Sequence, residues 1–234
     1  MKSKNIFDNE TKRDIIEWDI YNWSRAISFW ESFELEISSE KKVLELGSRN
    51  GGLSLYYALK GAEVICSDVN GPSKKAEQKH IKHNVLSNVK YEKIDALNIN
   101  YSSFFDVIIF KSVLGGIGRN DNINNQKKAI DQIYKALKKG GKLLFVENLS
   151  ASQLHKIIRN KFITWGKAWR YISEEEMIVF LNQFSTFQLK TFGFLGTFGR
   201  TEAQKTILGI LDKYFFEKIL PTRMNYIITG VAIK

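Results

Sequence analysis

Two short stretches of the chain hold the residue types of a nucleoside-binding site. Residues 42–54 read Lys-Val-Leu-Glu-Leu-Gly-Ser-Arg-Asn-Gly-Gly-Leu-Ser, and residues 63–68 form a second apolar run that ends in Asp68. The first stretch predicts a buried strand, a glycine-rich turn and the start of a helix, which together point backbone N–H groups at a ligand. An acid at the tip of the next strand is placed to accept hydrogen bonds from ribose hydroxyls. The pattern therefore predicts a nucleoside cofactor.

The middle of the glycine-rich turn distinguishes two kinds of nucleoside cofactor. A dinucleotide site needs small residues at three positions, because its backbone must approach a pyrophosphate closely. A side chain at Arg49, the middle position here, would crowd that approach, whereas S-adenosylmethionine has no pyrophosphate. The turn resembles motif I, E-x-G-x-G-x-G, of the class I S-adenosylmethionine-dependent methyltransferases. Glu45, Gly47 and Gly51 match this motif, and Arg49 replaces the glycine that the family places against the amino-acid end of the cofactor.

The resemblance continues in order along the rest of the chain. Residues 89–96 have a strand pattern ending in an Asp-Ala pair that resembles the family's adenine contact, and residues 105–110 are a fully buried strand by composition. Helical spacing over residues 126–139, a Gly-Gly stop and an apolar strand over residues 142–146 follow. The resemblance implies S-adenosylmethionine as the cofactor. The cofactor-binding residues that we expect are Glu45, Gly47, Ser48, Arg49, Gly51, Asp68, Val69, Asp95, Ala96, Lys111 and Ser112.

The order of these elements predicts an α/β fold in a single domain of 234 residues. The resemblance implies a doubly wound, seven-stranded, mostly parallel sheet, in which residues 186–194 and 225–233 resemble the family's closing antiparallel hairpin with a helical insertion. Residues 1–39 would form an N-terminal helical cover, residues 40–150 the cofactor half and residues 151–234 the acceptor side. No apolar run approaches the roughly 20 residues of a membrane span, and the polar start lacks a signal-peptide core. The single cysteine, Cys66, is typical of a cytoplasmic protein.

The positive charge of the chain is unevenly placed. The formal net charge is +10 at pH 7, and the stretch from Lys111 to Ile172 is rich in Lys and Arg and poor in acids. In a fold of this kind the acceptor approaches the loops that follow the fourth and fifth strands, so the surplus favours an anionic acceptor. A solvated basic surface is the alternative interpretation for the lysines of residues 126–139. An RNA substrate is a further alternative, although no separate RNA-binding module is evident.

Residues 152–171 have an amphipathic pattern that predicts a helix on the acceptor side. Leu154, Ile157, Ile158, Phe162 and Trp165 share one face of this helix, and basic residues occupy the rest. Such a helix packs on the domain, covers the acceptor, or contacts anionic lipid headgroups at a membrane surface. The aromatic stretch Asp14–Trp30 predicts helices that, in the resembling enzymes, cover the cofactor and part of the acceptor pocket. The acceptor-binding residues that we expect are Trp18, Tyr21, Trp23, Arg25, Arg159, Trp165 and Arg170.

The resemblance implies in-line attack of an acceptor oxygen or nitrogen on the sulfonium methyl group. A hydroxyl acceptor needs a general base, for which we expect His155 near the end of the fifth strand, with Glu147 as the next candidate. No metal ligand is expected, because the fourth strand ends in Lys111-Ser112 and offers Glu147 no partner acid. The sequence thus favours a metal-independent O-methyltransferase acting on a small or carrier-linked, sugar-like or lipid-linked acceptor. A non-catalytic cofactor-binding protein of the same fold stays open, because Arg49 departs from the motif.

Overall fold

The computed structural model describes residues 7–33, 38–162 and 168–234. In these ranges the strands form one sheet, in the order β3-β2-β1-β4-β5-β7-β6. Neighbouring strands from β3 to β5 pair in parallel, and β7 pairs antiparallel with both β5 and β6. The strands are β1 Lys42–Leu46, β2 Glu63–Asp68, β3 Val89–Lys93, β4 Phe105–Lys111, β5 Leu137–Asn148, β6 Thr186–Phe192 and β7 Ile227–Ile233. This topology confirms the doubly wound sheet with its closing antiparallel hairpin.

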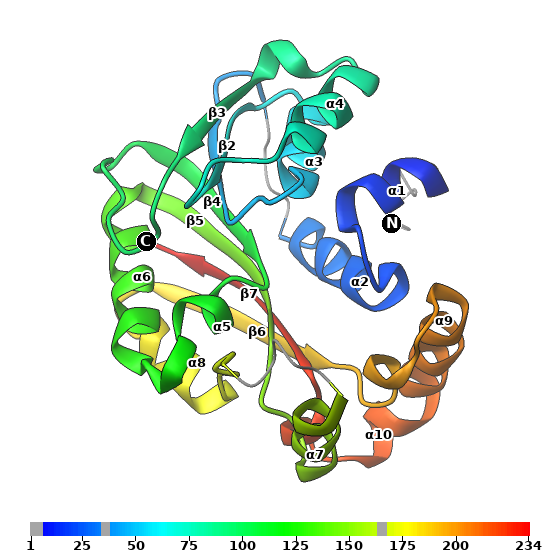
Figure 1. Ribbon diagram of the computed structural model, residues 1–234. Coiled ribbons are helices and arrows are strands. Elements are labelled where there is room, and N and C mark those ends of the chain that lie inside the picture. Colours follow the sequence, from blue (N-terminus) through cyan, green and yellow to red (C-terminus); the bar gives the residue numbers. More distant parts are fainter. Residues whose placement is uncertain (1–6, 34–37, 163–167) are drawn as a thin grey trace.

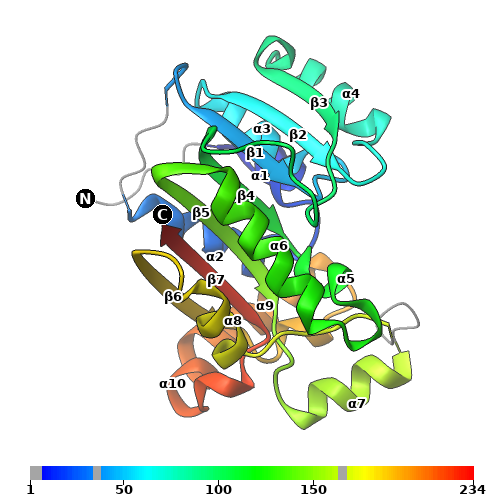
Figure 2. The same cartoon turned by 90° about the vertical axis from the view of Figure 1, so that its left-hand side faces the viewer.

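Helices cover both faces of the sheet (Figures 1 and 2). One face carries α1 Asn9–Ile16, α2 Ile20–Glu31, α3 Gly52–Leu59 and α4 Lys74–Lys82, and the other carries α5 Leu114–Ile117, α6 Ile123–Ala136 and α8 Glu174–Leu181. Beyond the carboxyl ends of the parallel strands lie α7 Gln153–Phe162, α9 Glu202–Leu211 and α10 Glu217–Ile219. Short turns of 3₁₀ or π type occupy Leu86–Asn88, Arg119–Asp121, Gly196–Phe198, Asp212–Phe216 and Thr222–Met224. None of the described helices is both long enough and apolar enough to traverse a bilayer.

The two sides of the central strands fill two separate cores. Val43 of β1 and Val107 of β4 point toward α2 and α3, whereas Leu44 and Ile108 point toward α6. Since side chains alternate along a strand, a strand covered on both faces must be apolar throughout, as β1 and β4 nearly are. The continuous apolar runs in the sequence thus predict the centre of the sheet correctly.

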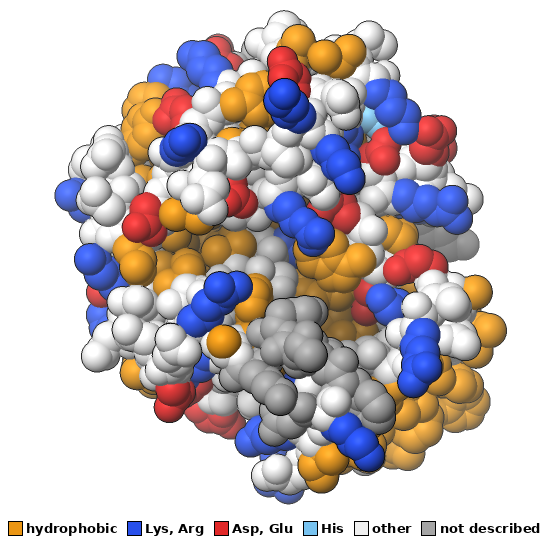
Figure 3. Space-filling view, viewed as in Figure 1, with side chains coloured by type: hydrophobic (Ala, Val, Ile, Leu, Met, Phe, Trp, Pro, Cys, Tyr) orange, Lys and Arg blue, Asp and Glu red, His pale blue; other side chains and the backbone are white. Residues whose placement is uncertain are grey.

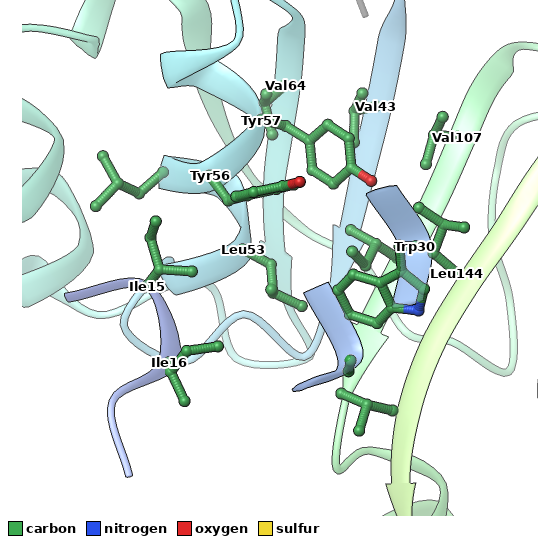
Figure 4. Packing of buried hydrophobic residues seen from close by; sticks show 14 of the residues in the cluster. Ile15, Ile16, Trp30, Val43, Leu53, Tyr56, Tyr57, Val64, Val107 and Leu144 are labelled. Atoms are coloured by element: carbon green, nitrogen blue, oxygen red, sulfur yellow. The ribbon is translucent and has the colours of Figure 1, made fainter. Parts of the chain in front are cut away.

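The N-terminal cover is part of the core. Trp30 of α2 is 1% exposed and packs beside Tyr57 of α3 and Leu144 of β5 (Figure 4). The sequence predicts one helical stretch over residues 14–30, but the chain turns between α1 and α2, where Glu17 and Asp19 have φ values of 72° and 48°. Neither residue is glycine or proline, so the sequence gives no signal for this turn. The turn brings the segment from Glu17 to Asp19 to the carboxyl edge of the sheet.

Two predicted boundaries are also corrected. The helix expected to reach Lys139 ends at Ala136, because β5 already begins at Leu137 and continues past an irregularity in its pairing with β4. The amphipathic helix after β5, α7, buries the face that the sequence predicts to be exposed. Among the side chains of this helix that the structure describes, those of His155 and Arg159 are buried, whereas Leu154 and Ile157 are 47% and 62% exposed.

Candidate functional site

A cavity of about 1070 Å³ opens at the carboxyl edge of the parallel strands. The strand order reverses between β1 and β4, and ligands of open α/β sheets bind in the crevice at that point. The loops after all five parallel strands, β1 to β5, line the cavity, together with the turn between α1 and α2 and residues near the start of β7. The space-filling view shows this face hollowed near its centre, with hydrophobic side chains in the hollow and Lys and Arg side chains around it (Figure 3).

The glycine-rich turn after β1 is a left-handed loop that forms one wall of the cavity. Gly47, Arg49 and Gly51 have φ values of 63°, 51° and 70°. A Cβ atom at Gly47 would lie 2.6 Å from Val113 Cγ2, so this position has no room for a side chain. Arg49 tolerates its left-handed backbone and places its guanidinium 6.0 Å from the centroid of the Trp18 ring. Arg49 therefore extends this wall toward the N-terminal cover.

Glu45 is a buried carboxyl group that caps helix α3. Its Oε1 accepts a hydrogen bond from the Leu53 N–H at 3.2 Å, and its Oε2 accepts from the N–H and hydroxyl of Ser54 at 2.7 and 2.5 Å. Burial raises the pKa of Glu45 to about 7, although these hydrogen bonds act in the opposite direction. Glu45 fixes the start of α3, and so the loop before it, while also lining the cavity.

The ends of β2 and β3 bring two predicted acids to the same cavity. Asp68 Oδ2 accepts a hydrogen bond from the Arg49 N–H at 3.2 Å, which ties the tip of β2 to the glycine-rich turn. The neighbouring Val69 is 60% exposed, and Asp95 follows β3 with Ala96 beside it. An exposed apolar side chain between two acids is a suitable surface for a flat base whose edges carry hydrogen-bonding groups.

The end of β4 connects the sheet to the N-terminal cover. Lys111 Nζ donates a hydrogen bond to the Ile16 carbonyl and lies 3.3 Å from the centroid of the Trp18 ring. Burial lowers the pKa of Lys111 to about 7. Ser112, the next residue, accepts a hydrogen bond on its hydroxyl from Asn148 Nδ2 at 2.8 Å. The ends of β4 and β5 are thus held together beneath the cavity.

Most of the predicted cofactor-binding residues are brought together by the structure. Those that line the cavity are Glu45, Gly47, Ser48, Arg49, Asp68, Val69, Asp95, Ala96, Lys111 and Ser112. Gly51 lies next to this wall, and its carbonyl accepts a hydrogen bond from His80 Nε2 at 2.9 Å. Among the predicted acceptor-binding residues, Trp18, Trp23 and Arg159 line the cavity, and Trp165 lies outside the described residues.

Three predicted acceptor-binding residues lie elsewhere. Arg25 forms a bidentate ion pair with Glu217, with both N–O distances at 2.6 Å. Arg170 is bound by Asp121 and Glu176, and Tyr21 packs against α9 near Gly209. The two arginines stabilise contacts between helices and loops, since their guanidinium groups already have carboxylate partners.

The two predicted general bases are engaged outside the cavity. His155 is completely buried, its Nε2 donates to the Phe194 carbonyl at 2.9 Å, and its Nδ1 hydrogen-bonds with the Ser152 hydroxyl at 2.7 Å. Burial lowers the pKa of His155 to about 4, and the nearby Arg159 acts in the same direction. This geometry does not support the predicted role of His155, because both ring nitrogens have partners and neither faces the cavity lining.

Glu147 is likewise a structural cap. Its Oε2 accepts from the N–H groups of Val113 and Leu114 at 2.7 Å, and its Oε1 accepts from the Asn148 N–H at 2.8 Å. Burial raises the pKa of Glu147 to about 7. The carboxyl group holds the start of α5, and Asn148 rather than Glu147 reaches the cavity.

The sequence analysis missed several residues that line the acceptor side. Asp19 is 3% exposed and accepts hydrogen bonds from Asn22 Nδ2 at 2.7 Å and from the Tyr226 hydroxyl at 2.8 Å. Burial raises the pKa of the Asp19 carboxyl group. The other missed residues are Asn148, Trp169, Tyr171, Thr197, Lys205 and Tyr226. The sequence offers a signal for three of these residues, because Asp19 lies in the aromatic stretch Asp14–Trp30 and Trp169 and Tyr171 lie in the amphipathic stretch of residues 152–171.

Residues 37–190 match the family model described as a methyltransferase domain. The chain belongs to this methyltransferase domain family. The family is that of the class I S-adenosylmethionine-dependent methyltransferases, and S-adenosylmethionine is its cofactor. The cavity fits this cofactor, with the turn around Gly47 at one end and the exposed Val69 between Asp68 and Asp95 at the other.

The relatives and structural neighbours of this methyltransferase domain are distant. A ubiquinone/menaquinone biosynthesis C-methyltransferase, UbiE of Pectobacterium carotovorum, is 28% identical over 126 residues, which cover 50% of this chain and 48% of that protein. The chain thus spans about half the length of the relatives it matches there. Phosphoethanolamine N-methyltransferase 2 of Haemonchus contortus, solved with S-adenosylmethionine, aligns with a TM-score of 0.66 and 16% identity over 99% of this chain and 58% of its own.

Two further solved structures share the fold over nearly their whole length. A SAM-dependent methyltransferase of Aquifex aeolicus has a TM-score of 0.54 and 12% identity over 97% of this chain and 94% of its own. The [4+2]-cyclase SpnF has a TM-score of 0.56 and 14% identity over 95% and 93%. Since one neighbour is named for a cyclisation, the fold alone does not determine the reaction.

Proposed function

We propose that the protein transfers a methyl group from S-adenosylmethionine to a small acceptor bound in the same cavity. The observation that carries this proposal is the continuity of one cavity, from the loops after β1, β2 and β3 to the walls formed by Asn148, Arg159 and Tyr226. A methyl transfer requires the donor and the acceptor to be held in line and close together, and such positioning supplies most of its rate enhancement.

In this proposal the cofactor lies against the half of the cavity formed by β1 to β4. Asp68 accepts hydrogen bonds from the ribose hydroxyls, and Asp95 accepts from the exocyclic amine of adenine. Val69 and Ala96 contact the base, while Arg49 and Ser48 lie toward the methionine end. Lys111 and Ser112 close the bottom of this half. When bound, the cofactor supplies an electrophilic methyl group on its sulfonium centre.

A proton acceptor is needed if the acceptor atom carries a proton. Of the carboxyl groups that line the cavity, Glu45 caps α3, Glu17 pairs with Lys79, and Asp68 and Asp95 belong to the cofactor half. Asp19 is the carboxyl group left on the acceptor side, and burial raises its pKa above the ordinary value, which makes it a stronger base than an exposed aspartate. We assign the role of general base to Asp19, in place of His155 and Glu147.

Two kinds of atom are candidates to receive the methyl group, an oxygen and an aromatic carbon. The surplus of positive charge and the buried Arg159 favour an oxygen of an anionic, sugar-like or lipid-linked metabolite, and the exposed Leu154 and Ile157 on α7 suit a lipid-linked one. The similarity to relatives named as C-methyltransferases favours an aromatic carbon instead. Flat aromatic side chains on the cavity wall fit such an acceptor, namely Trp18, Trp23, Trp169, Tyr171 and Tyr226. In this proposal, neither an oxygen acceptor nor a carbon acceptor requires a metal ion.

The single cavity shared by the cofactor and acceptor sides supports a small acceptor over RNA, which is the alternative suggested by the net charge. We place the reaction in the cytoplasm, because the single cysteine, Cys66, is a buried free thiol. The test is to incubate the protein with isotope-labelled S-adenosylmethionine and metabolite, lipid or RNA extracts, and to search each by mass spectrometry for a labelled methyl group. Label in a small molecule or lipid supports the proposal. Label only in RNA favours the alternative, and binding of the cofactor without label in any extract favours a non-catalytic binding protein.

A further inference from the structure

Arg159 is a buried arginine whose guanidinium group is only half used by the fold. The residue is 6% exposed and lines the acceptor side of the cavity. Its Nη1 donates to the Leu149 carbonyl at 2.7 Å and to the Ser150 carbonyl at 3.3 Å, and its Cζ lies 3.9 Å from the centroid of the Tyr171 ring. Its Nη2 has no hydrogen-bond partner among the described residues.

The charge of Arg159 is also unpaired within the part of the chain that the structure describes. Its polar contacts there are two neutral carbonyl groups and one aromatic ring, and no carboxylate forms an ion pair with it. Arg25 and Arg170 show the contrast, because each places its guanidinium on at least one glutamate. A buried charge without a counterion is destabilising, and it is retained where an opposite charge arrives from outside the fold.

The position of Arg159 separates it from the cofactor. The glycine-rich turn follows β1 and places the Arg49 guanidinium 6.0 Å from the centroid of the Trp18 ring, at the end of the cavity where the proposed function places the methionine part of the cofactor. Arg159 belongs to α7, which follows β5, and it shares its wall with Asn148, Tyr171 and Tyr226. An anion at Nη2 therefore belongs to the acceptor.

We propose that Arg159 is the recognition site for an oxyanion of the acceptor, a carboxylate or a phosphate group. This inference rests on the proposed function for the identity of the ligand as a methyl acceptor. The carbonyl groups of Leu149 and Ser150 bind one arm of the guanidinium and the Tyr171 ring packs against it, so the buried second arm keeps N–H groups that a charge-assisted hydrogen bond can use. The proposal thus limits the acceptor to molecules that carry a carboxylate or a phosphate group in addition to the atom that is methylated.

The experiment measures the binding of small oxyanions to protein saturated with S-adenosylhomocysteine. Inorganic phosphate and acetate are titrated by calorimetry at constant ionic strength into the parent, Arg159→Met and Lys156→Met, with acetamide as the neutral counterpart of acetate. Lys156 is the matched control, since it is an exposed cation on the same helix outside the cavity lining. We expect Arg159→Met to weaken the binding of at least one oxyanion by about tenfold or more, with Lys156→Met close to the parent. Comparison of phosphate with acetate shows which oxyanion the site prefers.

The proposal is overturned if the parent binds neither oxyanion, if it binds acetamide as well as acetate, or if Arg159→Met binds as the parent does. It is also overturned if Arg159→Met weakens S-adenosylhomocysteine to the same extent, because the guanidinium then serves the cofactor. If Arg159→Met does not fold, Arg159→Lys replaces it and should bind oxyanions more weakly than the parent. Failure of the methyl transfer itself would appear separately, as oxyanion binding that depends on Arg159 in a protein that transfers no labelled methyl group to any extract.

Discussion

On the cofactor side of the cavity, two acids are held by neighbours that are close in sequence, whereas on the acceptor side the buried acid Asp19 also depends on a distant segment. Glu45 caps α3 through Ser54, nine positions away, and Asp68 is bound by Arg49, 19 positions away. Asp19 is bound by Tyr226, at a separation of 207 residues. The two acids of the cofactor side therefore belong to a local motif, whereas the contact between Asp19 and Tyr226 forms only when the N-terminal cover and the start of β7 are assembled.

The two sides also differ in how their charges are satisfied. The carboxyl group of Glu45 accepts three hydrogen bonds from the start of α3, and Asp68 is tied to the adjacent turn. On the acceptor side, Arg159 keeps an unpartnered Nη2, and Asp19 is a buried acid held by neutral donors. This difference suggests a cofactor site fixed by the fold and an acceptor site whose charges await a ligand.

The largest effect that we expect comes from Asp19. If Asp19 removes a proton from the acceptor, Asp19→Asn should lower kcat by about two to four orders of magnitude, because the amide cannot act as a base. The affinity for S-adenosylmethionine should stay close to that of the parent, as measured by calorimetry. Turnover of Asp19→Asn equal to that of the parent would exclude Asp19 as the general base. The matched control is His155→Gln, which replaces another buried titratable residue that does not line the cavity.

On the cofactor side, Asp68→Ala should weaken S-adenosylmethionine binding by about 1.5 to 3 kcal/mol, the range for hydrogen bonds to a charged group. Asp95→Asn should cost less, because the amide keeps one acceptor but turns a donor toward the adenine amine. Calorimetric titration of S-adenosylmethionine into both variants measures which of them loses more binding free energy. An unchanged affinity in Asp68→Ala would place the ribose elsewhere, and a larger loss in Asp95→Asn would reverse the two roles.

The pH dependence of the unfolding free energy should show whether Glu147 acts as a structural cap or as a catalytic group. We expect this effect to be of intermediate size. Its pKa is raised by burial to about 7 in the folded protein, above the ordinary value of 4.5. Its contribution to stability is therefore complete below about pH 4.5 and is lost as the pH rises to about 7. Relative to Glu147→Gln, the parent should lose on the order of 1 to 3 kcal/mol of unfolding free energy across this window. Denaturant unfolding at several pH values measures the difference, and a difference that does not vary with pH would contradict the assignment.

The smallest expected effect concerns Arg49. Its left-handed backbone suits glycine, so Arg49→Gly should fold as well as the parent, while the loss of an exposed cation should weaken S-adenosylmethionine by about 0.2 to 1 kcal/mol. Tighter binding by the glycine variant would show that Arg49 only obstructs the cofactor. The same titration thus decides whether the departure from the family motif has a role.

These differences explain what the sequence could and could not predict. Glu45, Gly47 and Asp68 stand at the ends of apolar runs, so strand pattern and turn chemistry suffice to place them at one edge of a parallel sheet. The sequence predicts the wrong buried face for helix α7, because the apolar stripe with Leu154 and Ile157 is the expected packed side. The buried side carries His155 and Arg159, whose partners are carbonyl groups of Phe194 and Leu149 that no periodicity reveals.

The sequence does not predict the acceptor wall for the same reason, because periodicity does not reveal long-range contacts. Asp19 enters the cavity through a turn without glycine or proline, and Tyr226 reaches it from the start of the last strand. Arg25 and Arg170 had the composition of ligand-binding residues, but the fold supplies their carboxylate partners. Whether a polar side chain is used by the fold or is left for a ligand depends on long-range contacts, which one sequence does not contain.

The division of the cavity into two sides is tested most directly by titrating S-adenosylmethionine into the parent, Asp68→Ala and Arg159→Met under the same conditions. We predict that the parent binds one equivalent, that Asp68→Ala binds about tenfold or more weakly, and that Arg159→Met binds as the parent does. Failure of the parent to bind, or a loss in Arg159→Met that equals the loss in Asp68→Ala, would contradict the account.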